Sequence, residues 1–318
     1  MRHLLNILAA AILCSGCGYV GEPLPPALRI PQRVIDLAAV ERGGQVVVQF
    51  TAPVQTTEGL DIRNLDVIDL RVTPGGDPAA AKVFHPVPGG QTRIEHAIPA
   101  AEWVGKDVVI EVRIPSPKGR DSGWSNPVAL TIVPPLAQPP APELQAVSEG
   151  VRVTWPGSAP RYRVYRRVGD GSTRALRAES VPSEYLDTTA EYGKTYHYSV
   201  QGAQAGGNIR AESELSPEAS ITPEDRFPPA VPKGLAAVPS TGSIELTWDR
   251  NTEPDLAGYR VYRVEGSGVM ERQPDMPQTP GFSDRKIEPG RMYRYAVSSV
   301  DRTGNESKMS EPVQATAP

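Results

Sequence analysis

The two cysteines of this 318-residue chain, Cys14 and Cys17, have the CxxC spacing of thiol–disulfide oxidoreductases. Those enzymes place the motif at a helix N-terminus, where the thiolate is stabilised. No strand–helix–strand pattern follows the motif here, and no other cysteine occurs in the chain. We therefore expect no redox chemistry at this pair, and neither disulfides nor thiolate metal sites in the rest of the chain.

Histidine offers no recognisable catalytic or metal-binding arrangement. His85 and His96 lie in a region rich in Gly and Pro, without an HExxH motif or a third ligand at a suitable spacing. His197 lies between Tyr196 and Tyr198, so it is expected to point away from the core. The sequence also lacks GxSxG, P-loop and dinucleotide-binding motifs. We predict that the protein is not an enzyme and has no catalytic residue, metal site or cofactor.

Two groups of acidic residues could instead bind a cation. They are Glu58, Asp61, Asp66 and Asp69, and, further along, Asp249, Glu253 and Asp255. The first group lacks the alternate spacing of a calcium loop, and the second falls in a loop where polar turn residues are expected anyway. We interpret both as solvated surfaces, with cation binding at either as the alternative.

The first sixteen residues have the layout of a secretory signal peptide. Arg2 precedes an apolar run over residues 4–14, and the small residues Ser15 and Gly16 follow. The run is shorter than the roughly 20 apolar residues that a membrane-spanning helix needs. The sequence therefore predicts a signal peptide over residues 1–16.

Ser15-Gly16-Cys17 resembles a bacterial lipobox, in which a peptidase cuts before a cysteine that carries diacylglycerol. The resemblance implies that Cys17 is the lipidated first residue of the mature protein. Simple secretion with a free Cys17 and an uncleaved anchor are the alternatives. Gly18 follows, and similarity to lipoproteins of diderm bacteria, where Asp at this place favours the inner membrane, implies the outer membrane.

Residues 17–32 form a predicted Pro-rich tether, because Pro23, Pro25, Pro26 and Pro31 favour extended polyproline geometry. At about 3.1 Å per residue, residues 18–32 could hold the first domain roughly 45 Å from the lipid surface.

Two internal repeats dominate the second half of the chain. Apolar and polar residues alternate over 151–155 and again over 244–248, which predicts half-buried strands. RYRVYR at 161–166 matches GYRVYR at 258–263 with an offset of 97, which persists through the later strands. Trp155 and Trp248 are only 93 apart, so the loop that follows the second tryptophan is the longer one.

These residues resemble the fibronectin type III domain, with a Trp ending the second strand, YxVY on the third and a PGxxY turn. Glu288-Pro289-Gly290-Arg291-Met292-Tyr293 is such a turn. The resemblance implies that the Tyr293 hydroxyl caps a nearby backbone group. It also implies β-sandwich domains over 141–223 and 229–318.

Residues 33–134 fit the same template less closely. Alternation over 45–50 places Phe50 in the Trp position, residues 108–112 alternate as well, and residues 122–128 resemble the entry into the last strand. We interpret this region as a divergent fibronectin type III-like domain, with another kind of β-sandwich as the alternative.

Prolines mark the expected linkers, because proline lacks a backbone donor and stiffens connecting segments. They are Pro134, Pro135, Pro139, Pro140 and Pro142 between the first two domains, and Pro223, Pro228, Pro229 and Pro232 between the last two. The predicted fold is all-β: tandem immunoglobulin-like (fibronectin type III) β-sandwiches after a lipoprotein signal peptide and a Pro-rich tether.

Trp103 and Trp124 of the first domain are the candidate ligand contacts, because neither occupies the core position of the repeats. An exposed aromatic side chain can anchor a protein partner or stack on a sugar ring. Partial burial under loops is the alternative for each.

Composition and charge exclude one class of partner. With 33 Lys and Arg against 37 Asp and Glu, the net charge is −4 and no basic block occurs, so nucleic acid is not expected. We expect a non-catalytic cell-envelope protein, anchored by lipid and acting as a binding or spacer module; the sequence does not identify its partner. One alternative is an accessory subunit that binds glycan or an enzyme in a surface polysaccharide-processing or secretion system. Another is an enzyme with an unrecognised site within 33–134.

Overall fold

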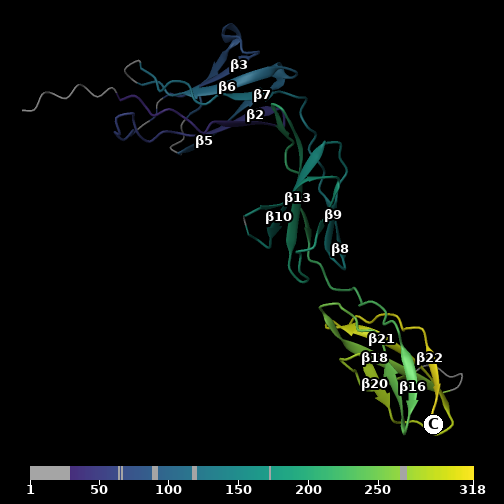
Figure 1. Cartoon of the computed structure of the whole chain (residues 1–318). Helices are drawn as coiled ribbons and strands as arrows, with labels where there is room; N and C mark the ends of the chain where they lie inside the picture. The colour runs from purple at the N-terminus through teal and green to yellow at the C-terminus, as the bar shows by residue number, and fades with distance from the viewer. Residues whose placement is uncertain are drawn as a thin grey trace, which may run out of the picture. The chain divides into compact units, whose positions relative to one another are not determined.

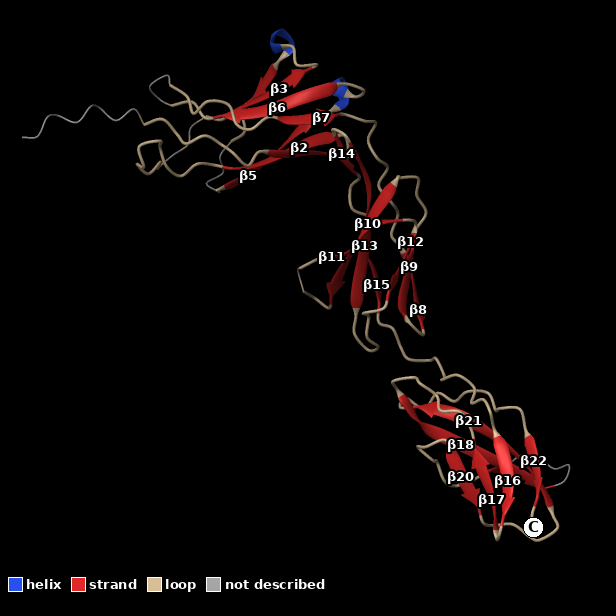
Figure 2. Cartoon of the chain, in the orientation of Figure 1, coloured by secondary structure: helices blue, strands red, loops and turns tan. Residues whose placement is uncertain are grey.

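The computed structural model describes residues 29–63, 65, 67–87, 92–116, 120–171, 173–265 and 271–318, and its regular structure is almost entirely β-strand (Figure 1, Figure 2). Two short 3₁₀ turns, η1 (Pro78–Ala80) and η2 (Ala101–Trp103), are the helical elements of these residues. No helix within them is long and apolar enough to cross a membrane. The all-β prediction is therefore confirmed. The predicted signal peptide and Cys17 lie outside the described residues, as does most of the tether.

The first sandwich has two sheets packed around one core. One sheet has the order β1 (Ala38–Arg42), β2 (Gln45–Thr51), β5 (Arg93–Pro99), and the other β4 (Lys82–Phe84), β3 (Asp69–Pro74), β6 (Asp107–Arg113), β7 (Val128–Thr131). Apolar side chains alternate along these strands, so one face of each sheet contributes to the core. Phe50 is 1% exposed and lies near the end of the second strand, as Trp155 and Trp248 do in the other sandwiches.

The second and third sandwiches repeat this arrangement. In the second, β8 (Glu143–Val147), β9 (Gly150–Thr154) and β12 (Glu184–Asp187) face β10 (Arg161–Val168), β11 (Ala175–Val181), β13 (Tyr196–Gly206) and β15 (Ala219–Ile221). In the third, β16 (Ala236–Ser240), β17 (Ser243–Thr247) and β20 (Gly281–Asp284) face β18 (Leu256–Glu265), β19 (Glu271–Arg272), β21 (Met292–Asp301) and β22 (Val313–Thr316). The third sandwich has the same strand order as the first. The prediction of tandem sandwiches is confirmed.

An edge-on pair of aromatic rings lies in each of these two cores. Trp155 packs against Tyr162 with ring centroids 5.4 Å apart at 69°, and Trp248 packs against Tyr259 at 5.1 Å and 71°. Each tyrosine hydroxyl also accepts a hydrogen bond from a backbone N–H of the loop that precedes it, from Ala159 at 3.1 Å and from Asn251 at 2.9 Å. Each pair therefore joins the core to the loop between the second and third strands.

The predicted corner tyrosine is confirmed. The Glu288 N–H donates to the Tyr293 hydroxyl at 2.9 Å, and the Glu191 N–H donates to the Tyr196 hydroxyl at the same distance. Both turns need glycine, because Gly193 and Gly290 have φ values of 76° and 77°. The turn from Glu191 to Tyr196 has Tyr192 in place of Pro289, and it forms the same hydrogen bond.

The sequence did not predict the environment of β14 (Ile209–Glu212). This strand forms a hairpin with the end of β13 and pairs in parallel with β1, so that Ala203–Glu214 belongs to the same compact unit as the first sandwich. Arg42 contacts Glu212 at 2.8 Å between Nη2 and Oε2, and the Gly43 N–H donates to the Glu212 carbonyl at 3.2 Å. The β1 edge is therefore covered by a strand from elsewhere in the chain.

Candidate binding surfaces

The predicted site residues were Cys17, Trp103 and Trp124, and the two tryptophans differ in their burial. Cys17 lies outside the described residues. Trp103 is 1% exposed and belongs to the core of the first sandwich, where the Phe84 ring meets it edge-on at 6.1 Å. This burial corrects the expectation of an exposed aromatic side chain at Trp103, because a ligand could reach the ring only if the core opened.

Trp124 is half-buried and lies beneath two arginine side chains. The guanidinium carbon of Arg71 is 3.8 Å from the ring centroid, and that of Arg113 is 4.7 Å away. Both arginines also form ion pairs: Arg71 Nη2 lies 2.5 Å from Glu111 Oε2, and Arg113 Nε lies 2.9 Å from Asp69 Oδ2. The two guanidiniums therefore cover part of the Trp124 ring through cation–π contacts. The role of Trp124 in ligand binding stays a prediction.

The histidines do not assemble a metal site within the described residues. His85 Nδ1 lies 3.3 Å from Asp69 Oδ1, whereas His96 is on β5 in the opposite sheet, where burial lowers its pKa. His197 lies between two buried tyrosines on β13 and is itself half-buried. Within the described residues, none of these three histidines belongs to a group of three or more side chains whose ligand atoms lie close enough together to hold a metal ion.

One acidic cluster does form, from residues that the sequence did not group. Carboxylate oxygens of Asp225, Asp255 and Asp301 lie within 4.8 Å of one another in the third sandwich and its linker. Burial alone would raise the pKa of Asp301, but hydrogen bonds from Asn305 and Thr303 outweigh it and lower that pKa. Asp301 is 2% exposed, and both of its carboxylate oxygens already accept hydrogen bonds from Thr303 and Asn305. We therefore interpret the cluster as part of a hydrogen-bond network that stabilises the loop after β21.

The arrangement most like catalytic machinery is an Arg–Asp–Tyr group repeated in two sandwiches. In the second, Asp187 Oδ2 accepts from Arg166 at 2.7 Å and from the Tyr198 hydroxyl at 2.9 Å. The corresponding residues of the third are Arg263, Asp284 and Tyr295, with distances of 3.0 and 2.8 Å.

Burial and hydrogen bonding together shift the pKa values in these Arg–Asp–Tyr groups. Burial, together with the hydrogen bond to Asp187, raises the pKa of Tyr198 well above its ordinary value, and the same causes act on Tyr295 with Asp284. Burial would raise the pKa of Asp187, but hydrogen bonds from Thr189 and Tyr198 outweigh it and lower that pKa. Tyr198 and Tyr295 therefore stay protonated near neutral pH, and Asp187 stays ionised beside Arg166, as in a structural ion pair.

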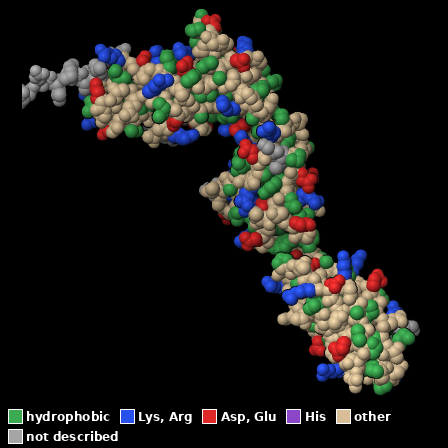
Figure 3. Space-filling model, viewed as in Figure 1, with side chains coloured by type: hydrophobic (Ala, Val, Ile, Leu, Met, Phe, Trp, Pro, Cys, Tyr) green, Lys and Arg blue, Asp and Glu red, His purple; other side chains and the backbone are tan. Residues whose placement is uncertain are grey.

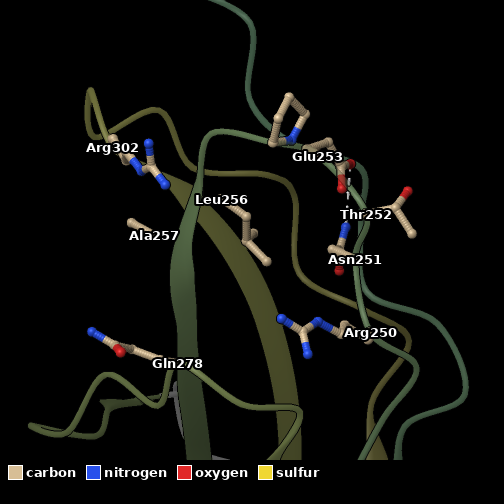
Figure 4. A pocket seen from close by; sticks show the side chains of 9 residues that line it. Arg250, Asn251, Thr252, Glu253, Leu256, Ala257, Gln278 and Arg302 are labelled. Atoms are coloured by element: carbon tan, nitrogen blue, oxygen red, sulfur yellow. Dashed lines mark hydrogen bonds between the residues drawn. The ribbon is translucent and has the colours of Figure 1, made fainter.

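A cleft of about 750 Å³ opens at one end of the third sandwich. The loop between β17 and β18 supplies one wall, Gln278 comes from the segment before β20, and Arg302 follows β21 directly. Figure 4 shows the guanidinium groups of Arg250 and Arg302 directed toward the space around Leu256. The loop that forms the wall is the one whose greater length is visible in the sequence, but the two arginines were not predicted.

The wall of this cleft is held in place by backbone contacts. Glu253 Oε1 accepts the Ala230 N–H at 2.6 Å and the Asn251 side-chain amide at 3.3 Å. The Arg302 N–H donates to the Asp255 carbonyl at 2.9 Å. Hydrogen bonds therefore join the linker, the β17–β18 loop and the loop after β21.

A second cleft, of about 890 Å³, lies in the first sandwich where the chain enters it. Arg29 and Pro31 line it together with Leu60, Ile62 and Arg63. The entering chain is tied there by the Thr57 N–H, which donates to the Ile30 carbonyl at 2.8 Å. This cleft mixes apolar and charged side chains.

Acidic and basic side chains are interspersed on the face of the molecule in Figure 3, without a large patch of one sign. This agrees with the mild net charge of −4. Nothing on that face resembles the basic stripe that nucleic-acid binding uses.

Comparison with known proteins supports fibronectin type III domains. Residues 233–318 match the family model described as "Fibronectin type III domain SaeA third domain". Among solved structures, the FN1-FN3 domains of chicken CNTN1 align with 90% of this chain and 99% of that one. The identity of that alignment is 15% and its TM-score is 0.30, too low to establish a common arrangement of domains.

Parts of the chain are also similar to parts of two longer proteins. An amylopullulanase of Thermoanaerobacterium saccharolyticum is 35% identical over 115 residues, which are 36% of this chain and 9% of that protein. Endoglucanase B of Cellulomonas fimi is 30% identical over 155 residues, 47% of this chain and 14% of the enzyme. The chain thus spans a small part of the length of these relatives.

Proposed function

We propose that this chain is a non-catalytic, lipid-anchored protein of the cell envelope, held at the outer membrane through Cys17, whose sandwiches act as binding and spacer modules. The lipobox-like residues and the Pro-rich segment after them support the anchor. A rigid sandwich with loops at its ends suits a binding or spacing role, because the strands form a frame and the loops can vary.

One observation carries the non-catalytic part of the proposal. The strongest candidate for acid–base chemistry, the Arg–Asp–Tyr group, occurs in two sandwiches at the same offset of 97 residues. Both copies bury the aspartate almost completely, with Asp187 at 0% and Asp284 at 2% exposure. A group that is repeated in consecutive domains and closed to substrate stabilises the domains and does not form an active site.

The anchor is tested by intact mass and membrane fractionation of the full chain expressed in a diderm host, beside Cys17→Ser. We expect the wild type to lose 16 residues, to gain the mass of acyl chains and to sediment with the outer membrane, and the variant to do none of these. If both proteins are soluble and unmodified, the anchor is wrong and a freely diffusing secreted binder replaces it.

The second candidate function is that of an accessory subunit that binds glycan or a partner enzyme in a polysaccharide-processing or secretion system. The similarity to modules of an amylopullulanase and an endoglucanase favours it. Pull-down on envelope and plant-type glycans tests it, with Trp124→Ala as the aromatic variant, since Trp103 belongs to the core. No retention on any glycan argues against this candidate.

A further inference from the structure

We propose that the cleft of the third sandwich binds the carboxylate of an acidic saccharide, with Arg250 and Arg302 as its cationic contacts. This inference rests on the binding-module role proposed above and names the ligand class for one site. Anchoring through Cys17 is independent of it, so either can fail without the other.

The two arginines differ from most arginines on the strands of the sandwiches. Arg260 pairs with Glu306 and Arg263 with Asp284 in the same domain. Within the described part of the chain, the exposed side chains of Arg250 and Arg302 make neither an ion pair nor a hydrogen bond. Their donors are therefore available to a ligand, and guanidinium binds carboxylate in a bidentate manner.

The longer loop creates this cleft, and the second sandwich provides an internal comparison. Residues 250–254 and Leu256 form much of the wall, whereas the corresponding loop of the second sandwich, residues 156–160, is shorter and has no charged side chain. The hairpin that follows β13 is paired with β1, while Arg302 directly after β21 lines the cleft. The longer loop and its Arg250 thus have no counterpart in the corresponding loop of the second sandwich.

The charge balance of the lining favours an anion. Glu253 is the only carboxylate among the described residues that line the cleft, so the two guanidiniums leave the lining with a net charge of +1. Its Oε1 is engaged by Ala230 and Asn251. Asp255 and Asp301 lie close in the fold but form no ion pair with Arg302 within the described residues.

The remaining lining favours a saccharide over a protein and an acidic saccharide over a neutral one. Gln278 and Thr252 offer amide and hydroxyl groups to sugar hydroxyls, and Leu256 gives a small apolar contact. The volume of about 750 Å³ falls in the usual range for small ligands. Among the described residues, the lining contains neither an aromatic ring on which a neutral sugar could stack nor an apolar core like that of a protein interface. Charge must therefore supply the affinity.

The test is calorimetric titration of the full chain with oligogalacturonate, with maltooligosaccharide and poly-glutamate as the comparison ligands. Arg250→Ala and Arg302→Ala are each expected to weaken oligogalacturonate binding roughly tenfold, the loss of one charge-assisted contact. Arg272→Ala on β19 removes the same charge outside the cleft and is expected to leave affinity unchanged. Binding should also weaken as salt is raised.

Each outcome decides the proposal. Binding of oligogalacturonate but not of maltooligosaccharide, lost in the double variant and kept in Arg272→Ala, supports it. Equal binding of poly-glutamate would show that the cleft selects charge and not a saccharide, which overturns the ligand class. No binding of oligogalacturonate, or binding that the double variant retains, overturns the site itself, whatever the membrane fractionation shows.

Discussion

The Tyr295 hydroxyl donates to Asp284 Oδ2 at 2.8 Å across the interior of the third sandwich, where both side chains are at most 2% exposed. Arg263 reaches the same oxygen from the third strand at 3.0 Å, and the Lys286 N–H donates to Oδ1 at 3.0 Å. One buried carboxylate therefore links the two sheets and the turn after β20. Its charge is compensated by these neighbours, so removing it should cost more than removing an exposed ion pair.

Asp284→Asn should destabilise the third sandwich by about 3 kcal/mol, because it leaves the largely buried Arg263 without its anion. Chemical denaturation of the full chain measures this, with the Trp248 signal taken as the difference in emission from the same protein carrying Trp248→Phe. Asp275→Asn, an exposed change in the same domain, is the control and should stay within about 0.5 kcal/mol of wild type. Equal stability of the two variants would contradict the structural role of the carboxylate.

Glu218 should give the second sandwich an acid-sensitive contribution to stability. Hydrogen bonds from Arg167 and Arg174 lower its pKa from 4.5 to about 2. A lowered pKa stabilises the folded state above pH 4.5, and this contribution is lost as the pH falls toward about 2. Glu218→Gln should therefore be less stable than wild type at pH 6, and the difference should shrink at pH 3.

Denaturation at the two pH values checks this, with Glu143→Gln at an exposed position as the control. If Glu218→Gln and wild type differ in stability by the same amount at both pH values, the ion pairs of Glu218 are not the cause of that difference.

The sequence predicted those features that follow from local pattern. Alternation located the strands and put Trp155 and Trp248 at the end of the second strand of their domains, and the repeat at 97 residues put the corner tyrosines Tyr196 and Tyr293 in equivalent positions. The structure confirms both. It did not predict that Trp103 enters the core, because a 3₁₀ turn after β5 carries this side chain and no alternating strand reveals it.

Contacts between distant segments had no local signal. β14 pairs with β1 although some 170 residues separate Arg42 from Glu212, and parallel pairing leaves no turn motif in the sequence. Likewise, Arg250 and Arg302 approach one cleft only because their two loops lie at the same end of the sandwich. The longer loop was the one visible sign of that cleft.

Arg42→Ala should loosen the hairpin on the β1 edge. The change removes a contact to Glu212 while leaving the core of the first sandwich intact, and we expect a loss below about 1 kcal/mol in global stability. Amide hydrogen exchange should nevertheless become several-fold faster over β14, since local opening depends on such contacts. Arg152→Ala on β9 removes a comparable exposed pair elsewhere and should leave β14 unchanged. Unaltered exchange over β14 in Arg42→Ala would mean that backbone pairing alone holds the hairpin.

Trp124 should respond to the two arginines that lie over it. Arg71→Ala removes the closer guanidinium, 3.8 Å from the ring centroid, and we expect a loss of about 1 kcal/mol together with greater exposure of the indole. The emission of Trp124 should shift to longer wavelength, measured as the difference from the same change in a Trp124→Phe background, which cancels the other tryptophans. Arg120→Ala, at an exposed position in the same domain, should produce no shift. If Trp124 also binds glycan, Arg71→Ala should strengthen that binding by uncovering the ring; unchanged emission would instead show that the cation–π contact does not shield it.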